Sequence, residues 1–171
     1  MIVVKVGGSL FDHAGFGPAI RRCLDQFREP VTLVAGGGLC ADAVRTYDRI
    51  HELGEERSHW LALRAMAVTA EMLRSLIGEM PNVTLLDAFE FCETDSVLPH
   101  TWAVTSDSIA VRAVERFAAT RLILLKSVDL PSGRTWSDAA VAGLVDEYFP
   151  EAVSRLTCPV EWINFRSVFA E

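Results

Sequence analysis

Short apolar runs alternate with longer amphipathic stretches along the chain. Runs with the length of buried strands cover residues 2–6, 31–35, 83–86, 122–125 and 160–164. Apolar residues at three- and four-residue spacing predict helices over residues 16–27, 39–53, 57–77, 105–119 and 137–145. Residues 87–104 follow neither pattern, so an irregular segment is expected there. Strands separated by helices in this way are typical of an α/β fold, a mainly parallel sheet with helices on both faces.

Small residues follow several of these strands and predict where a site lies. Gly7, Gly8 and Ser9 follow the first strand, and Gly36, Gly37 and Gly38 follow the second. Residues 126–129 end the fourth strand, and residues 105–108 begin a helix. Ligands of parallel sheets bind outside the carboxyl ends of the strands. We therefore expect these four segments to meet at one edge of the sheet.

Size and charge limit the classes of function. The chain has 171 residues, of which 50% are hydrophobic and 23% are charged, and this predicts a single domain over residues 1–171 with a proper core. The net charge of −7 argues against nucleic acid or an anionic membrane as a partner. The sequence contains no apolar run of the roughly 18 residues that a membrane helix needs.

Cysteine and histidine spacing argues against a disulfide framework or a metal site. The four cysteines lie far apart without a C-x-x-C pair, and the four histidines are equally scattered. Buried, reduced thiols and a cytoplasmic location are expected instead. No metal-binding residues are predicted.

Lys5 stands inside the first apolar strand, directly before a glycine turn. Backbone N–H groups of Gly7 and Gly8 and the Ser9 hydroxyl could hold phosphate oxygens, with Lys5 as a nearby cation. The alternative is a plain glycine turn, with Lys5 extending its ammonium to solvent at a sheet edge.

Lysine is scarce, which makes its two positions informative. Lys5 and Lys126 are the two lysines of the sequence, and the other cationic side chains are arginines. Each lysine is followed by small polar residues, a pattern that suits a charge clamp for a phosphoryl group in transfer. The carboxylate of Asp107, at the start of a predicted helix, could hold both ammonium groups in position.

The second glycine turn has two readings. Residues 36–41 fit G-x-G-x-x-A, the fingerprint of dinucleotide-binding proteins, so an NAD(P)-binding enzyme is an alternative. That fingerprint needs an acidic residue about 20 positions later, at the end of the next strand. Glu55 and Glu56 have this distance but stand between two predicted helices. An anion or acceptor seat is the better interpretation, and Asp42 either complements the helix dipole or contacts the substrate.

Other polar and aromatic residues are candidates for substrate binding. Thr105 and Ser106 either cap a helix or face the substrate. Four further side chains could line a pocket or belong to the core: His59, Trp60, Arg64 and Trp102.

Four motifs, taken in order, resemble the amino-acid kinase superfamily, which includes acetylglutamate, aspartate and uridylate kinases. They are "VVKVGGSL" at 3–10, "VAGGG" at 34–38, "TSDSIA" at 105–110 and "LILLKSVD" at 122–129. The resemblance implies a three-layer αβα sandwich of the carbamate-kinase type. It also implies transfer of the γ-phosphoryl group of ATP, with Mg²⁺, to a carboxylate, carbamate or phosphate.

The resemblance also implies a role for each matched residue. Lys5 would neutralise the transferring group, and Asp107 would orient both lysines. The turn at 7–9 would hold the ATP phosphates, and the glycines at 36–38 would seat the acceptor. The residues facing the nucleotide would be Lys126, Ser127 and Asp129.

A closer likeness points to one branch of this superfamily. The segments "WAVTSDSIA", "LLKSVD" and "GLVDEYFP" resemble a short branch associated with methanofuran-type one-carbon cofactor biosynthesis. Its members look like kinases that convert an aminomethylfuran-methyl phosphate to the diphosphate. An aromatic acceptor of this kind would suit Trp60 and Trp102.

The C-terminal part departs from the superfamily pattern. Relatives continue after the fourth strand into a β-hairpin and a lysine-bearing helix, whereas here Asp129 is followed by Leu130-Pro131 and 42 residues remain (130–171). A shortened nucleotide lobe is expected, closed by a strand in "CPVEWINFR". This leaves open a non-catalytic sensor or structural subunit that keeps the kinase fold. The apolar surface of the helix at 57–77 predicts a homodimer.

Overall fold

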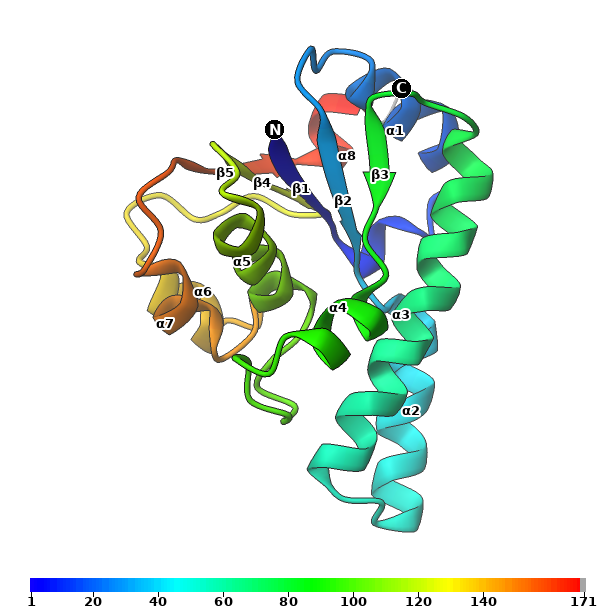
Figure 1. Ribbon diagram of the computed structural model, residues 1–171, viewed down its shortest axis with the longest axis vertical. Helices are drawn as coiled ribbons and strands as arrows, with labels where there is room; N and C mark the ends of the chain where they lie inside the picture. Colours follow the sequence, from blue (N-terminus) through cyan, green and yellow to red (C-terminus); the bar gives the residue numbers. More distant parts are fainter. Residues whose placement is uncertain (170–171) are drawn as a thin grey trace.

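A five-stranded parallel sheet forms the centre of the protein, in a computed structural model that describes residues 1–169. Its strands are β1 (Ile2–Val6), β2 (Val31–Ala35), β3 (Val83–Leu85), β4 (Leu122–Lys126) and β5 (Val160–Asn164). They lie in the order β3-β2-β1-β4-β5, and every neighbouring pair is parallel (Figure 1). The carboxyl ends of all five strands therefore share one edge of the sheet.

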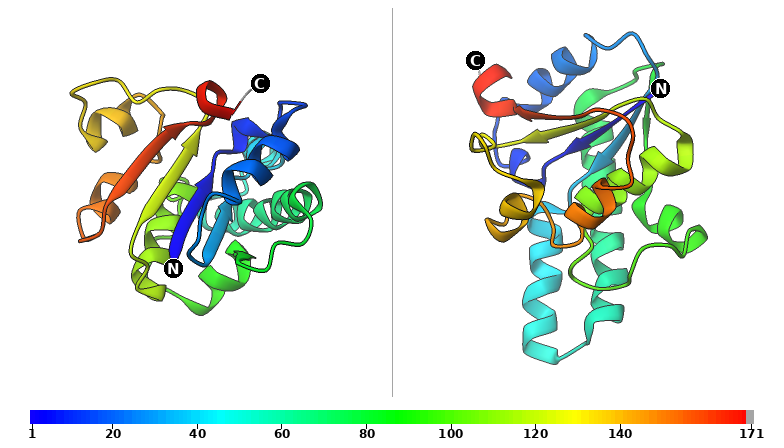
Figure 2. Two further views of the ribbon diagram at one scale, coloured as in Figure 1. Left: turned by 90° about the horizontal axis from the view of Figure 1, so that it is seen from above. Right: turned by 90° about the vertical axis from the view of Figure 1, so that its left-hand side faces the viewer.

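Helices cover both faces of this sheet, as Figure 2 shows. They are the 3₁₀ helix η1 (Gly8–Leu10) and the α-helices α1 (Phe16–Leu24), α2 (Gly38–His51), α3 (Glu55–Ile77), α4 (Ala88–Thr94), α5 (Ser106–Phe117), α6 (Trp136–Val141), α7 (Phe149–Val153) and α8 (Phe165–Phe169). Alternate strand residues point to opposite faces. Val3, Leu122 and Leu124 pack in a core with α5 and α7, while Val4 and Ile123 pack in a core with α1 and α8. The predicted αβα sandwich is confirmed.

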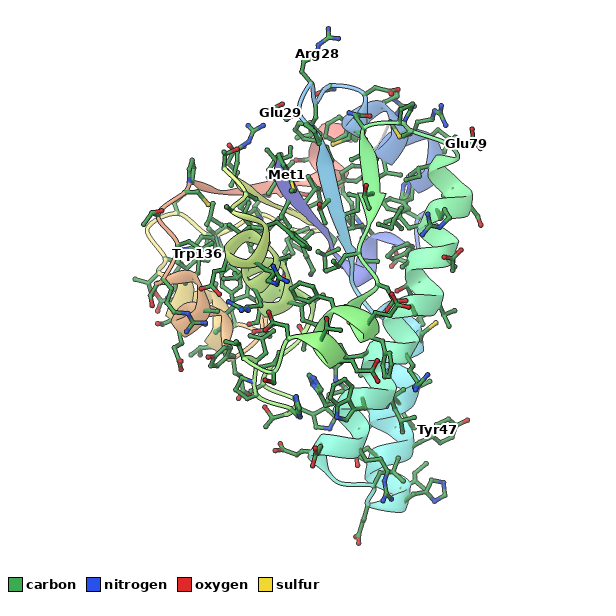
Figure 3. The ribbon with its side chains drawn as sticks, in the orientation of Figure 1. Met1, Arg28, Glu29, Tyr47, Glu79 and Trp136 are labelled. Carbon is green, nitrogen blue, oxygen red and sulfur yellow. The ribbon has the colours of Figure 1, made fainter. Side chains whose placement is uncertain are left out.

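The helices α2 and α3 form an arm that extends beyond the sheet (Figures 1 and 2). The turn between them uses positive φ angles at Glu52 (49°) and Gly54 (87°). The ring of Tyr47 points away from α2 at the outer part of this arm (Figure 3). Near the sheet, α3 contributes Leu63 and Met66 to one core and Leu73 and Ile77 to the other.

The structure differs from the sequence-based expectation in three segments. Residues 87–104 are not wholly irregular, because Asp87 accepts hydrogen bonds from the backbone N–H groups of Phe89 and Glu90 and caps α4. The helix predicted over 137–145 ends at Val141, and Gly143 has a φ of 68° soon afterwards. The predicted final strand is followed by the short helix α8. Within residues 1–169, no helix has both the length and the apolar character to cross a membrane.

Candidate active site

Lys5 and Lys126 meet at one buried carboxylate. The Nζ atom of each lysine lies 2.8 Å from Oδ1 of Asp107, and Lys126 also donates to Oδ2 at 3.0 Å. Lys5 is 4% exposed, Asp107 is 4% exposed and Lys126 is 8% exposed. The sheet explains this geometry, because β1 and β4 are neighbours and both lysines stand on the face that α5 covers. The structure thus brings the three predicted catalytic residues together.

Burial and charge act against each other in this cluster. Burial, and after it the charge of Lys5, lowers the pKa of Lys126 to about 8 against the attraction of Asp107. Burial would raise the pKa of Asp107, but the two lysines outweigh burial and hold this pKa below its ordinary value. With both lysines protonated, one carboxylate balances two cations. The cluster therefore carries an excess positive charge, which suits a multiply charged anion.

The two glycine turns touch each other through their backbones. A β-carbon on Gly8 would lie 2.7 Å from Cα of Gly38, and one on Gly36 would lie 2.6 Å from the nitrogen of Gly8. Real β-carbons do not approach backbone atoms so closely, so only glycine fits at these two positions. Gly38 also has a φ of 49°. The first and second turns therefore form one continuous backbone surface.

A cavity of about 230 Å³ opens beside this surface. Ten of the predicted site residues line it: Gly8, Ser9, Gly36, Gly37, Gly38, Asp42, His59, Trp102, Thr105 and Ser106. Ala62, Leu63 and Met66 form its apolar walls. The three charged residues of the buried cluster do not line the cavity, but Ser106 in its wall directly precedes Asp107 in the chain.

One wall of the cavity is a polar and aromatic group that reaches into the helical arm. The Nε1 atom of Trp102 donates to Oδ2 of Asp48 at 2.8 Å. The guanidinium of Arg45 lies 4.9 Å from the Trp102 ring and also pairs with Asp42 at 3.0 Å. Arg45 lines the cavity and was not predicted from the sequence. Its position on α2, one turn after Asp42, was the available signal.

Two predicted substrate residues lie outside this cavity. Trp60 packs against Phe89 and His100, with ring centroids 5.6 and 4.8 Å away. The guanidinium of Arg64 lies over the Phe89 ring at 4.0 Å. Trp60 and Arg64 share a helix face, as their spacing predicts, but that face of α3 meets α4 instead of the cavity.

The residues predicted to face the nucleotide lie beside the first glycine turn. The hydroxyl of Ser127 is 2.9 Å from the hydroxyl of Ser9. Gly7 donates its N–H to the carbonyl of Leu125 at 2.8 Å and so extends the contact between β1 and β4. Asp129 is exposed two residues further on.

Asp146 is a buried carboxylate that sequence reasoning missed. It accepts hydrogen bonds from the backbone N–H groups of Thr105 and Ser108, at 2.9 and 3.0 Å. Thr105 stands at the N-cap position of α5, as expected, but its own side chain does not cap the helix. The capping carboxylate comes from the loop between α6 and α7, and only the motif "GLVDEYFP" drew attention to that loop.

The described residues offer no ready-made metal cage. Within residues 1–169, no group of three or more His, Cys, Asp or Glu side chains is placed to hold a metal ion. Magnesium often binds through substrate phosphates with one or two protein ligands. An Mg²⁺ ion held by the phosphates of a nucleotide would not require such a group.

Comparison with known proteins places this site in context. The sequence matches no model of a protein family. It is 26% identical over 191 aligned residues to the (5-(aminomethyl)furan-3-yl)methyl phosphate kinase of Methanocaldococcus jannaschii, covering 97% of this chain and 88% of that protein. This relative supports the predicted small-molecule phosphotransferase.

Solved structures of uridylate kinases share the fold. The enzyme of Archaeoglobus fulgidus superimposes with a TM-score of 0.65 at 16% identity, covering 99% of this chain and 94% of that one. The UMP kinase of Bacillus anthracis has a TM-score of 0.68 at 11% identity, covering 99% of this chain and 92% of that one. The UMP kinase of Ureaplasma parvum has a TM-score of 0.60 at 12% identity, covering 95% of this chain and 89% of that one. In sequence and in fold, the chain resembles the kinases of the amino-acid kinase superfamily, as its motifs predict.

Proposed function

We propose that the protein is an ATP-dependent kinase that transfers the γ-phosphoryl group to an ionised oxygen of a small acceptor. The observation that carries this proposal is the pair of buried lysines within 2.8 Å of one Asp107 oxygen, next to two glycine turns in contact. Phosphoryl transfer depends mainly on positioning and on neutralising negative charge. A cationic cluster beside two glycine turns that contact each other supplies both.

The residues of the site have distinct roles in this reaction. The bond between the γ-phosphorus and its bridging oxygen breaks, the electron pair leaves with ADP, and an acceptor oxygen forms the new bond. Lys5 and Lys126 neutralise the transferring group, while the turn at Gly7–Ser9 holds the donor phosphates. A phosphate or carboxylate acceptor is already ionised near neutral pH, so no general base is needed. Mg²⁺ bound to ATP would add further positive charge.

The acceptor we favour is an aminomethylfuran-methyl phosphate. The name of the Methanocaldococcus jannaschii relative supports it. The glycines at 36–38 offer a seat for its phosphate, and Trp102 offers an aromatic wall for a flat ring in the same cavity.

Coupled ADP release tests the acceptor. The purified protein is supplied with ATP, Mg²⁺ and one acceptor at a time: the furan phosphate, UMP or acetylglutamate. Turnover with the furan phosphate alone is the expected result. Turnover with another acceptor while the furan phosphate does not react would overturn the acceptor, and the kinase proposal would stand.

Nucleotide binding separates a kinase from a non-catalytic protein with the same fold. Calorimetric titration with a non-hydrolysable ATP analogue and Mg²⁺ should show binding below millimolar concentration, and Lys5→Ala should weaken it. If wild-type protein does not bind millimolar nucleotide, the sensor or structural subunit becomes the better account.

The NAD(P)-binding alternative has little support. Glu55 and Glu56, the acidic residues at the required distance from Gly36–Ala41, form the first turn of α3. This turn lies at the outer end of the helical arm, far from the strand ends (Figure 1). A ribose bound near the second glycine turn would not reach them.

We also propose that the protein forms a homodimer through α3. The helix carries an exposed apolar stripe: Leu61, Val68, Met72 and Leu76. Arg57 and Glu79 lie 11 residues on either side of Val68, and Glu79 stands just beyond the end of the helix (Figure 3). An antiparallel copy centred on Val68 would therefore bring Leu61 within one residue of the position opposite Leu76 and would place Arg57 opposite Glu79.

Sedimentation equilibrium tests this dimer. Wild-type protein should sediment at twice the chain mass, and Val68→Glu should sediment as a monomer. Val141→Glu, on the exposed end of α6, serves as the control and should remain dimeric. A wild-type monomer at high micromolar concentration would exclude this interface.

The cytoplasmic location remains part of the proposal. All four cysteines are free. Burial raises the pKa of the Cys23 and Cys92 thiols to about 12, so these two side chains behave as inert core residues. Unpaired thiols of this kind suit a reducing compartment.

A further inference from the structure

We propose that Asp146 is a positioning residue: its carboxylate fixes the first turn of α5 and thereby holds Asp107 between the two lysines. The consequence for turnover depends on the proposed kinase function. The consequence for the lysines themselves does not, and it can be measured separately.

Asp146 binds both ends of the tetrapeptide 105–108. Its Oδ2 atom accepts from the N–H of Thr105 at 2.9 Å, the hydroxyl of Thr105 at 3.0 Å and the N–H of Ser108 at 3.0 Å. Its Oδ1 atom accepts a hydrogen bond from the hydroxyl of Ser108. Asp146 is 9% exposed, so water competes little for these bonds. Four hydrogen bonds donated to one carboxylate leave the tetrapeptide little freedom to rotate.

Asp107 lies between the two anchored residues. Its carboxylate can reach both lysines only if the first turn of α5 has this orientation. A displacement of about 1 Å in a catalytic group is enough to lower a rate by about a hundredfold. The anchor at Thr105 and Ser108 therefore sets the position of the carboxylate that the lysines share.

The loop that carries Asp146 also binds one of the lysines directly. The carbonyl of Leu144 accepts from Nζ of Lys126 at 2.6 Å. The N–H of Tyr148 donates to the carbonyl of Ala103 at 3.0 Å, just before the tetrapeptide. Residues 144–148 thus connect Lys126 to the helix that bears its partner Asp107. A helix cap with a purely structural role would not need the contact to Lys126.

The titration of the two lysines can be followed directly, because the sequence contains no other lysine whose signals would overlap. Protein labelled with ¹³C at the lysine ε-carbon should give two lysine signals, which Lys5→Arg assigns. Lys126 faces Asp107 on α5, Lys5 on β1, the Leu144 carbonyl and the ring of Trp162 on β5 at 5.3 Å. Asp107 is the acidic group that raises its pKa, so displacement of Asp107 should lower it.

Asp146→Ala is the decisive variant. We expect the pKa of Lys126, measured from its ε-carbon shift, to fall by about one unit or more. With active protein, kcat should fall about tenfold to a hundredfold while the KM for ATP changes less than about threefold. Asp146→Asn should restore both values, because its amide oxygen can accept the three Oδ2 bonds and its NH₂ can donate to Ser108.

Asp138→Ala is the matched control. Asp138 belongs to the capping box of α6, where its carboxylate accepts hydrogen bonds from the N–H and the hydroxyl of the N-cap residue Thr135, both at 2.8 Å, and it has no hydrogen bond to the lysine cluster. It should alter stability without moving either lysine signal. If Asp146→Ala does not fold, Ser108→Ala removes one of the four bonds and should lower the pKa of Lys126 by a smaller amount.

Two results would overturn the proposal. One is a folded Asp146→Ala protein in which both lysines titrate as in wild type. The other is a folded Ser108→Ala protein with unchanged lysine titration when the Asp146 variant does not fold. A wild-type protein without kinase activity would overturn the proposed function, but the lysine titration would still decide the role of Asp146.

Discussion

Replacing Asp107 with asparagine should change how the free energy of unfolding depends on pH, and this change reports the charge balance of the site. Asparagine keeps the shape of the side chain but removes the negative charge between two buried ammonium groups. Each Nζ atom lies 2.8 Å from Oδ1, so the centres of opposite charge are about 4 Å apart. At an effective dielectric constant of about 20, this separation corresponds to an attraction of about 4 kcal/mol.

Lys126 can relieve this loss by releasing its proton. In wild type the pKa of Lys126 is about 8, below the unfolded value of 10.5. Between these two pH values the unfolded chain binds the proton more strongly, so the free energy of unfolding rises with pH. Without Asp107 the folded pKa falls further. Between pH 6 and 8 the variant then folds with a neutral lysine while its unfolded chain binds a proton, so raising the pH stabilises it. In wild type Lys126 contributes no change over this range, because it is protonated in both the folded and the unfolded state.

The stability gap between the two proteins should therefore narrow with pH. The variant alone gains stability over the two pH units from 6 to 8, at about 1.36 kcal/mol for each unit. The difference in unfolding free energy between wild type and variant should therefore shrink by roughly 2–3 kcal/mol between pH 6 and pH 9. Urea unfolding followed by tryptophan fluorescence at both pH values measures it. An equal gap at pH 6 and pH 9 would refute the charge balance.

Asp95→Asn provides the comparison. The Asp95 carboxylate binds Arg112 at 2.8 Å and has a side chain that is 7% exposed. The hydrogen bonds that Arg112 donates to Asp95 and Glu115 raise the pKa of Arg112, which cannot release its proton below pH 9. This variant should be destabilised by the same amount at both pH values.

Three further predictions concern the site and the core. Lys5→Ala should lower kcat by about a hundredfold or more in the coupled assay, because it removes one preorganised cation, and unchanged turnover would exclude the role of Lys5. Gly8→Ala should lower both turnover and the free energy of unfolding, because its β-carbon would meet Cα of Gly38 at 2.7 Å and push the two turns apart; wild-type kinetics would contradict the contact. Iodoacetamide at pH 8, followed by mass spectrometry, should modify Cys23 and Cys92 much more slowly than the other two cysteines, since burial raises the pKa of both thiols to about 12; equal rates in folded protein would argue against that burial.

The fold could be predicted from the sequence because its signals are local. Five apolar runs bounded by glycine, proline or polar residues gave the strands and their parallel arrangement. The segment around α4 could not be predicted in this way, because its helix depends on the cap from Asp87 and on the burial of Phe91 and Cys92. Short helices with few apolar residues show little periodicity.

The site was predictable only where a strand or turn fixes the backbone. Lys5 and Lys126 lie on neighbouring strands, so their convergence follows from the sheet, and the glycine turns follow from the same topology. Asp146 lies 38 residues after Ser108 in a loop of irregular structure, and no spacing rule connects them. For Trp60, helical spacing gave the correct face, but the packing of α4 determined what that face contacts.

The scarcity of lysine also determines how the protein reacts with amine-directed reagents. Both ε-amino groups are enclosed, since Lys5 is 4% exposed and Lys126 is 8% exposed. Acylating dyes, biotin esters and surface-coupling reagents should therefore modify both lysines slowly in the folded protein. Slow acylation of a lysine would report transient opening of the enclosed cluster, and a ligand that closes the cluster would slow that reaction.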